Sequence, residues 1–330
     1  MTIAGLDLDP YLNDPERRGA SMAQIADVIV PCLDAAAARS VIEIGALAGD
    51  LTRVLVDWAV RSGARVLAVD PSPHRPLIEL ASESAELQLV RETSLAALPR
   101  VELADAVIID GDHNYFTVTE ELRLIEERAP ARELPLVLLH DVCWPHARRD
   151  DYFAVERIPE EFRHPVAGSA GGLVPGEPGL RGDGLPYPGS AAREGGPRNG
   201  VLTAVEDFLA GRPELRLAVV PAFFGLGVVW RADAAYAGAL ERLLGPLDRN
   251  PLLERLEANR VEQLAVSHAA AVALEAEQRR RARHEAVLER MLESRAFTIA
   301  ERLSGLRMRA GIAPDQSVVS KEEIRRALDR

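Results

Sequence analysis

Short apolar runs alternate with helix-like stretches between residues 40 and 139, and this alternation restricts the chain to few folds. Five runs have the length of buried strands, and each ends at a turn or an acidic residue: Ser40–Ile44, Arg65–Val69, Leu87–Val90, Ala106–Ile109 and Leu136–Leu139. Strands that alternate with helices pair in parallel through right-handed crossovers. Two later apolar runs, Leu215–Val220 and Phe223–Trp230, predict an antiparallel hairpin that closes the sheet. An α/β fold is therefore expected.

The same pattern divides the chain into three parts. We expect a helical lead-in over 1–39, a Rossmann-like, doubly wound, mostly parallel sheet domain over 40–232, and a helical extension over 233–330. Residues 164–200 interrupt the domain with 11 glycines and 6 prolines in 37 positions, which predicts a long loop. Such a loop is either a disordered linker or a lid over a substrate, and the return of regular structure from Asn199 favours the lid.

The C-terminal extension has no glycine or proline from residue 252 to residue 304, which predicts one long helix or two. Its apolar residues form an imperfect stripe that the polar segment Gln278–Arg283 interrupts. The stripe suits a helix packed on its own core and an oligomerising coiled coil equally well. The extension is thus a candidate oligomerisation element, and a homo-oligomer is the expected assembly.

Composition argues against several classes of partner. The net charge is −12, and the first 232 residues carry 22 Lys and Arg against 35 Asp and Glu. This disfavours nucleic acid, because phosphate backbones require clustered cations. No apolar run approaches the roughly 18 to 20 residues that span a bilayer, and no signal-peptide pattern is evident, so a cytoplasmic protein is expected. Cys32 and Cys143 form no disulfide or metal pattern.

A glycine-containing loop follows the first predicted strand. Glu43 ends that strand, Gly45 and Gly49 follow, and an amphipathic helix begins at Asp50. Glycines in such a turn remove Cβ atoms where a ligand approaches the backbone. The second strand ends at Asp70, whose carboxylate can accept hydrogen bonds from ribose hydroxyls. Loop and acid together predict a cofactor that contains a nucleoside.

The loop does not match the dinucleotide-binding pattern Gly-x-Gly-x-x-Gly, because Leu47 stands where that pattern has its second glycine. A cofactor with a ribose but no phosphates, such as S-adenosylmethionine, fits better. A nicotinamide-dependent oxidoreductase is the disfavoured alternative.

Acidic residues and histidines follow the fourth and fifth strands: Asp110, Asp112, His113, His140 and Asp141. The carboxyl ends of neighbouring parallel strands share one crevice, so these side chains should converge there. Asp110, His140 and Asp141 could hold a divalent cation such as Mg²⁺, and the imidazole also admits Mn, Fe or Zn. Alternatively His113 or His140 acts as the general base with an ordinary pKa near 6.5; neither role excludes the other.

These motifs resemble the class I S-adenosylmethionine-dependent methyltransferases. Within that class they are similar to a bacterial branch with IDGDH after the fourth strand and HD after the fifth, which is related to macrolide sugar O-methyltransferases and to the cephalosporin methylation protein family. The segments that carry the resemblance are Glu43–Gly45, Asp70, Ile109–Tyr115 and His140–Pro145. Sugar-modifying relatives have Asp-Asp where this chain has His140-Asp141. The resemblance therefore gives weaker support to a metal at this position.

The resemblance implies a set of cofactor-binding residues: Glu43, Gly45, Ala46, Gly49, Asp70, Thr93, Ser94 and Asp110. The loop that begins at Glu43 would flank the methionine part, Asp70 would bind the ribose, and Thr93 and Ser94 would lie near the adenine. Asp110 would sit beside the sulfonium and a metal. The implied catalytic residues are His113, Asp110 and His140.

The predicted activity is O-methylation of a small-molecule acceptor, a sugar or another polyhydroxylated compound such as a glycosylated metabolite, in a natural-product or glycan pathway. The proton would leave the acceptor through His113 or a metal at Asp110, His140 and Asp141. An accessory protein that binds the cofactor and supports a partner enzyme through the 251–304 helix is the second hypothesis.

Overall fold

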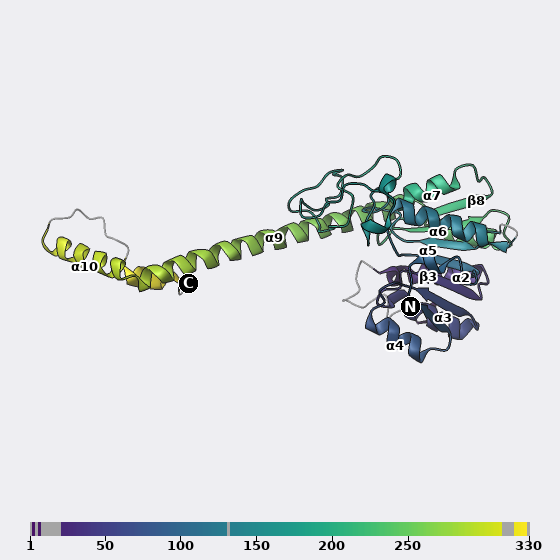
Figure 1. Cartoon of the computed structure of the whole chain (residues 1–330), viewed down its shortest axis with the longest axis horizontal. Coiled ribbons are helices and arrows are strands. Elements are labelled where there is room, and N and C mark those ends of the chain that lie inside the picture. The colour runs from purple at the N-terminus through teal and green to yellow at the C-terminus, as the bar shows by residue number, and fades with distance from the viewer. Residues whose placement is uncertain (1, 4–5, 8–20, 131–132, 312–319, 329–330) are drawn as a thin grey trace. The chain divides into compact units, whose positions relative to one another are not determined.

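The computed structural model describes residues 2–3, 6–7, 21–130, 133–311 and 320–328. The chain divides into two compact units, Met1–Ala265 and Val266–Arg330. A seven-stranded sheet with the order β5-β4-β3-β6-β7-β9-β8 forms the centre of the first unit (Figure 1). The first five strands in this order pair in parallel, and β9 runs antiparallel to both β7 and β8. The predicted Rossmann-like α/β sheet with a terminal antiparallel hairpin is confirmed.

The five parallel strands have the predicted bounds: β3 (Ser40–Ile44), β4 (Arg65–Val69), β5 (Leu87–Val90), β6 (Ala106–Ile109) and β7 (Leu136–Leu139). Both faces of a doubly wound sheet are covered, which is why β6 and β7 are apolar and buried throughout. Alternate residues enter two separate cores, so that Ile108 packs on one face and Ile109 on the other.

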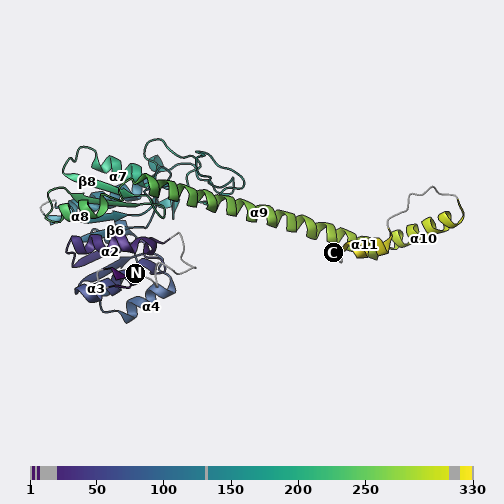
Figure 2. The same ribbon diagram turned by 180° about the vertical axis from the view of Figure 1, so that it is seen from behind.

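Helices cover both faces of the sheet (Figures 1 and 2). One core receives α2 (Ala26–Ala35), α3 (Asp50–Ser62), α4 (Arg75–Glu83) and α8 (Ala237–Leu244). The other receives α5 (Ser94–Ala97), α6 (Tyr115–Arg128) and α7 (Val201–Leu209). The sheet is therefore the middle of three layers, and its carboxyl edge remains open for a ligand.

The lead-in expected over residues 1–39 falls partly outside the described residues. Its described parts are the strands β1 (Thr2–Ile3) and β2 (Leu6–Asp7) and the helices η1 (Met22–Ile25) and α2. Ser21 caps η1 by accepting a hydrogen bond from the backbone N–H of Ala23 at 3.2 Å. The serine therefore begins the helical segment.

The hairpin strands are β8 (Leu215–Val220) and β9 (Leu226–Arg231). The predicted start of the second strand at Phe223 is wrong. Phe223 and Phe224 have φ values of 50° and 70°, in the left-handed region that a strand does not use. A Cβ on Gly225 would lie 2.5 Å from Sγ of Cys143, so a tight turn presses this segment against the end of β7. Apolar content alone does not distinguish such a turn from a strand.

Residues 164–200 contain no α-helix or β-strand, as predicted, and all of them are described. The short helices η3 (Val155–Arg157) and η4 (Glu160–Phe162) precede them. Isolated antiparallel bridges hold the loop together: Val166 with Ala191, Gly172 with Arg181, and Leu173 with Leu185. Leu173, Ser190 and Ala191 are fully buried. The loop is packed, unlike a disordered linker, and its role as a lid stays a prediction.

Two helices, α9 (Pro251–Glu293) and α10 (Arg295–Arg309), occupy the segment predicted as one or two, and α11 (Lys321–Leu328) follows. The first compact unit extends to Ala265, beyond the boundary expected at residue 232. The reason is burial, since α8 places Leu240 and Leu244 in the core and α9 buries Val261 and Ala265.

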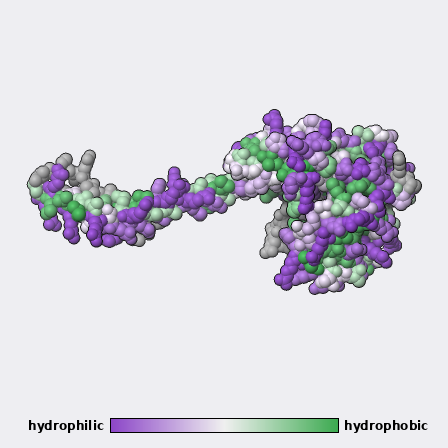
Figure 3. Space-filling model, in the orientation of Figure 1, coloured by the Kyte–Doolittle hydropathy of each residue, from purple (hydrophilic) through white to green (hydrophobic). Residues whose placement is uncertain are grey.

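The surface of α9 does not present one continuous apolar face. Polar and apolar side chains are interspersed along it in the space-filling view (Figure 3). Leu256, Leu264 and Leu274 are exposed among charged neighbours. Within the described residues, no helix has the length and apolar character needed to cross a membrane. The oligomerisation role of the extension stays a prediction.

Candidate active site

The strand order reverses between β3 and β6, which places a crevice at their carboxyl ends. Gly45 follows β3 with a φ of 85°, and a Cβ there would lie 2.0 Å from the backbone oxygen of Asp110. The sequence suggested that this glycine makes room for a ligand. The structure gives a more direct reason, because only glycine lets the two strand ends approach this closely.

The loop after β3 is held by Asp70. One carboxylate oxygen accepts the backbone N–H of Leu47 at 2.7 Å, and the other accepts that of Ser72 at 2.7 Å. Each oxygen keeps a second acceptor position, so ribose binding stays a prediction compatible with these contacts. Gly49 precedes the first residue of α3 with a φ of 83°, which brings backbone N–H groups of the helix start toward the crevice.

Glu43 is buried beneath this loop. Its carboxylate accepts the hydroxyl of Thr52 at 2.7 Å. Burial raises the pKa of Glu43 to about 8, against the lowering effect of the Thr52 hydrogen bond. A positively charged ligand group near this residue would therefore be stabilised by the ionised carboxylate.

A cavity of about 820 Å³ lies along this edge of the sheet. That volume is typical of sites for cofactors and drug-sized ligands. Most of the residues predicted for the site line it: Glu43, Gly45, Ala46, Asp70, Thr93, Ser94, Asp110, His113, His140 and Asp141. Gly49 is not among the lining residues, although its neighbours Ala48 and Asp50 are.

Two carboxylates and two imidazoles form a closed ring at the ends of β6 and β7. Oδ1 of Asp110 lies 3.0 Å from Nδ1 of His140 and 3.5 Å from Nε2 of His113. Oδ2 of Asp141 lies 3.2 Å from Nδ1 of His140 and 3.3 Å from Nδ1 of His113. We call these four residues the acid–histidine ring. The convergence expected from the strand ends is present, with acid and base alternating.

This alternation sets the pKa values in the ring. Burial alone raises the pKa of Asp110 and of Asp141, but the adjacent imidazoles outweigh burial and hold both below their usual range. Burial alone lowers the pKa of an imidazole, but the carboxylates raise the pKa of His113 to about 9 and that of His140 well above 6.5. The expectation of an ordinary histidine pKa is therefore wrong, because the sequence does not reveal two carboxylates against each ring.

His140 is anchored from its other side by a segment that sequence reasoning missed. Nε2 of His140 donates to the backbone oxygen of Phe223 at 2.8 Å, since a carbonyl only accepts. The carboxylate of Glu257, in α9, accepts the backbone N–H groups of Phe223 and Phe224 at 3.1 and 2.7 Å. Arg260 pairs with Glu257 at 2.6 Å. The first turns of the C-terminal helix thus position a residue of the ring.

The ring has the donor atoms of a divalent-cation site. Ligand atoms of Asp110, His140 and Asp141 lie within 4.8 Å of one another. Because Nε2 of His140 donates to a backbone carbonyl, Nδ1 is the nitrogen that faces the two carboxylates, which is the usual arrangement for a metal-binding histidine. The three predicted metal ligands therefore fit a cation, although a proton on Nδ1 satisfies the same two carboxylates.

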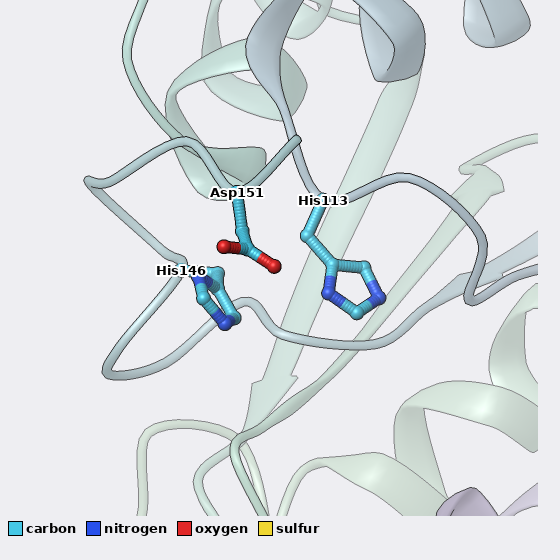
Figure 4. Close-up of side chains that lie close together, drawn as sticks. All are labelled: His113, His146 and Asp151. Carbon is cyan, nitrogen blue, oxygen red and sulfur yellow. The ribbon is translucent and has the colours of Figure 1, made fainter. Parts of the chain in front are cut away.

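A second cluster, His113, His146 and Asp151, lies on the same cavity (Figure 4). Its ligand atoms are also within 4.8 Å of one another. Neither His146 nor Asp151 was singled out from the sequence. The only signal was their position just after the HD motif, and a loop without regular structure gives no spacing rule to bring them together.

Other lining residues were missed, because no local pattern marks them: Phe153, Arg157, Tyr187 and Phe224. Leu47 has a φ of 41° and is 53% exposed, which places a large apolar side chain at the mouth of the cavity. Of residues 164–200, only Tyr187 reaches the cavity wall. These residues give the acceptor side an aromatic surface.

The open carboxyl edge of the sheet and its cavity define the class of protein as a Rossmann-like α/β domain with room for a cofactor-sized ligand. Residues 42–142 match the model of a family described as a methyltransferase domain. This match covers the loop after β3, Asp70 and the acid–histidine ring. Over residues 42–142 the chain is therefore similar to methyltransferases, and this match gives no support to the nicotinamide alternative.

The solved structures that the chain resembles are distant in sequence. A methyltransferase from Podospora anserina, PaMTH1, with bound SAH is 15% identical, with a TM-score of 0.42, and the match covers 68% of this chain and 88% of that one. The O-methyltransferase TomG from Streptomyces achromogenes, involved in tomaymycin synthesis, is 14% identical, with a TM-score of 0.39, and the match covers 68% and 86%. No curated protein matches the sequence. These likenesses do not assign an acceptor.

Proposed function

We propose that the protein methylates a hydroxyl oxygen of a sugar or another polyhydroxylated small molecule. The observation that carries the proposal is the acid–histidine ring, which lies in one cavity with the loop after β3. A hydroxyl becomes a good nucleophile only if its proton is removed, and the ring offers groups for that task. The assignment of a sugar as the acceptor depends on the resemblance of Ile109–Tyr115 and His140–Pro145 to sugar O-methyltransferases. The polar and aromatic side chains that line the cavity suit such an acceptor.

In this proposal the cofactor lies along the carboxyl ends of β3, β4 and β5. Gly45 and Ala46 lie against its methionine part, and Asp70 accepts hydrogen bonds from the ribose hydroxyls. Thr93 and Ser94 flank the adenine. The proposal is supported by the position of these residues on one cavity wall, in the order in which the strands lie in the sheet.

The acceptor oxygen attacks the methyl carbon in line with the carbon–sulfur bond, which breaks as the carbon–oxygen bond forms. The sulfonium is a good leaving group, so the chain mainly aligns the oxygen and accepts its proton. We assign proton acceptance to His113, whose protonated form Asp110 and Asp141 stabilise. Asp110 and His140 position it. A cation at Asp110, His140 and Asp141, when bound, would lower the pKa of the hydroxyl.

Isothermal titration of the full chain with S-adenosylmethionine and with its demethylated product tests the cofactor. We expect both to bind, and Asp70→Asn should weaken binding about tenfold, the loss of one charge-assisted hydrogen bond. Glu79→Gln, at an exposed position of α4, is the matched control and should bind normally. A chain that binds neither compound would contradict the proposal.

A mass-spectrometric assay with sugars, glycosylated metabolites, phenols and amines tests the acceptor. We expect a single added methyl group on a hydroxyl oxygen of a sugar-containing compound. Transfer confined to amines or phenols would reject the sugar assignment while leaving the methyltransferase activity in place.

A further inference from the structure

The cluster of His113, His146 and Asp151 assembles metal-ligating side chains from two segments, which follow β6 and β7. In Figure 4 the Asp151 carboxylate lies between the two imidazoles. The rings of His113 and His146 are 5.4 Å apart between centroids and tilted by 34°, so they are not stacked face to face. Two imidazoles and a carboxylate around one point form a ligand set that a single ion can bridge.

His146 supplies an independent observation that points to a ligand. Its side chain is 4% exposed, and its Nδ1 is buried without a hydrogen-bond partner among the described residues. Native structures usually give such an atom a partner, and a bound ion would be one.

The cluster is held in place by its own surroundings. The backbone N–H of Asp151 donates to the backbone oxygen of His113 at 2.9 Å, which joins the two segments directly. The backbone oxygen of His146 accepts the N–H of Val201 at 2.9 Å. Oδ1 of Asp151 accepts the hydroxyl of the buried Ser190 at 2.7 Å, an orienting contact of the kind found behind metal ligands.

We propose that His113, His146 and Asp151 bind a late first-row divalent ion such as Zn²⁺ or Co²⁺ on the wall of the cavity. Imidazole ligands favour these ions over Mg²⁺, which prefers oxygen. Three protein ligands leave coordination positions for water or for an acceptor oxygen, as in sites where zinc is not purely structural. This site is distinct from the one at Asp110, His140 and Asp141.

An ion at this position takes His113 as a ligand and withdraws it from proton transfer. We therefore expect excess Zn²⁺ to slow methyl transfer, whereas Mg²⁺ at the same concentration does not. This consequence rests on the proposed function, but the binding of the ion does not. The two can fail separately, because binding is measured without an acceptor or a cofactor.

Co²⁺ titration of the untagged, chelator-treated full chain, followed by visible absorption, tests the site. We expect one equivalent to bind with the ligand-field bands of a site of low coordination number, and Zn²⁺ to displace it. His146→Ala and Asp151→Asn should each weaken binding by about a hundredfold or more, and Ser190→Ala by about tenfold, since it orients a ligand without touching the ion.

The controls separate this site from its neighbours. His164→Ala removes a histidine that contacts the oxygen of Arg198 and lies outside the cluster, and it should leave Co²⁺ binding unchanged. Asp110→Asn should also retain the bands. Loss of binding in Asp110→Asn with retention in Asp151→Asn would overturn the proposal, as would a folded wild-type chain that binds no Co²⁺. If His146→Ala does not fold, Asp151→Asn and Ser190→Ala still decide the outcome.

Discussion

The wall of the cavity proposed to bind the cofactor, here the cofactor side, and the wall proposed to face the acceptor, the acceptor side, are built from different kinds of segment. On the cofactor side, Gly45 and Asp70 immediately follow parallel strands, so the sheet itself positions them. On the acceptor side, His146, Tyr187 and Phe224 come from loops that only tertiary hydrogen bonds hold in place. A parallel sheet thus dictates one wall, and the other wall is free to differ among proteins with the same sheet.

The two sides also differ in how they treat buried carboxyls. Glu43 and Glu121 are also buried, and burial raises the pKa of each to about 8, because the hydroxyls of Thr52 and Ser94 offset only part of this effect. In the acid–histidine ring, imidazoles hold the pKa values of Asp110 and Asp141 below their usual range. Burial is similar, so the difference shows that the placement of partners decides which carboxyls stay charged.

The largest expected effect tests the claim that the cofactor side depends on strand ends. Gly45→Ala places a Cβ 2.0 Å from the backbone oxygen of Asp110, and it should lower the free energy of unfolding by more than about 4 kcal/mol. Gly63→Ala is the control, because Gly63 has a similar positive φ but open space around it, and it should cost only about 1 kcal/mol. Chemical denaturation measures both. Equal effects would show that backbone strain alone matters.

The next effect concerns proton transfer on the ring. His113→Asn should reduce kcat by about a hundredfold or more while S-adenosylmethionine affinity changes little. Carboxylates raise the pKa of His113 to about 9, and only the deprotonated imidazole accepts a proton, so the wild-type rate should rise with pH up to about 9. A pH–rate profile that is flat from pH 7 to pH 10 would contradict the role of His113.

Glu121→Gln tests the contrast between buried carboxyls. The pKa of Glu121 is raised from 4.5 to about 8, so the native state retains a proton that the unfolded chain loses over this range. The stability of the wild type should therefore fall as the pH rises from about 4.5 to 8. The glutamine variant lacks this slope and should be more stable at pH 8 by up to roughly 2 to 4 kcal/mol. Thermal melts of both proteins at pH 5 and pH 8 measure the difference. An equal change in melting temperature between the two pH values for the wild type and the variant would refute the prediction.

The smallest expected effect tests whether the C-terminal helix supports the acceptor side. Glu257→Gln weakens the acceptor for the N–H groups of Phe223 and Phe224 and breaks the ion pair with Arg260, which frees the carbonyl that holds His140. We expect a roughly tenfold loss in kcat, about 1.4 kcal/mol, with cofactor affinity unchanged. Glu262→Gln, at an exposed position of the same helix, should have no effect. A loss of cofactor affinity in Glu257→Gln would contradict the claim that the helix supports only the acceptor side.

Much of the sheet could be predicted because its signals are local. The strands Ser40–Ile44 and Leu136–Leu139 are short apolar runs bounded by breakers, and their observed bounds agree with prediction. The segment at Phe223 failed because the left-handed turn there is imposed by contact with Cys143, which lies eighty residues earlier in the chain. The periodicity of apolar residues depends only on neighbours in sequence, so it does not reveal such contacts.

The sequence by itself determined which residues meet at the carboxyl edge of the sheet, since parallel pairing forces the positions after each strand, such as Asp70 and Asp110, onto one side. It also indicated the class of cofactor. Only the tertiary structure decided the charge state of the ring, the support that Glu257 gives to His140, and the meeting of His113 with His146. The physical reason is that ionisation and coordination depend on distances of a few ångströms between groups that no local pattern relates.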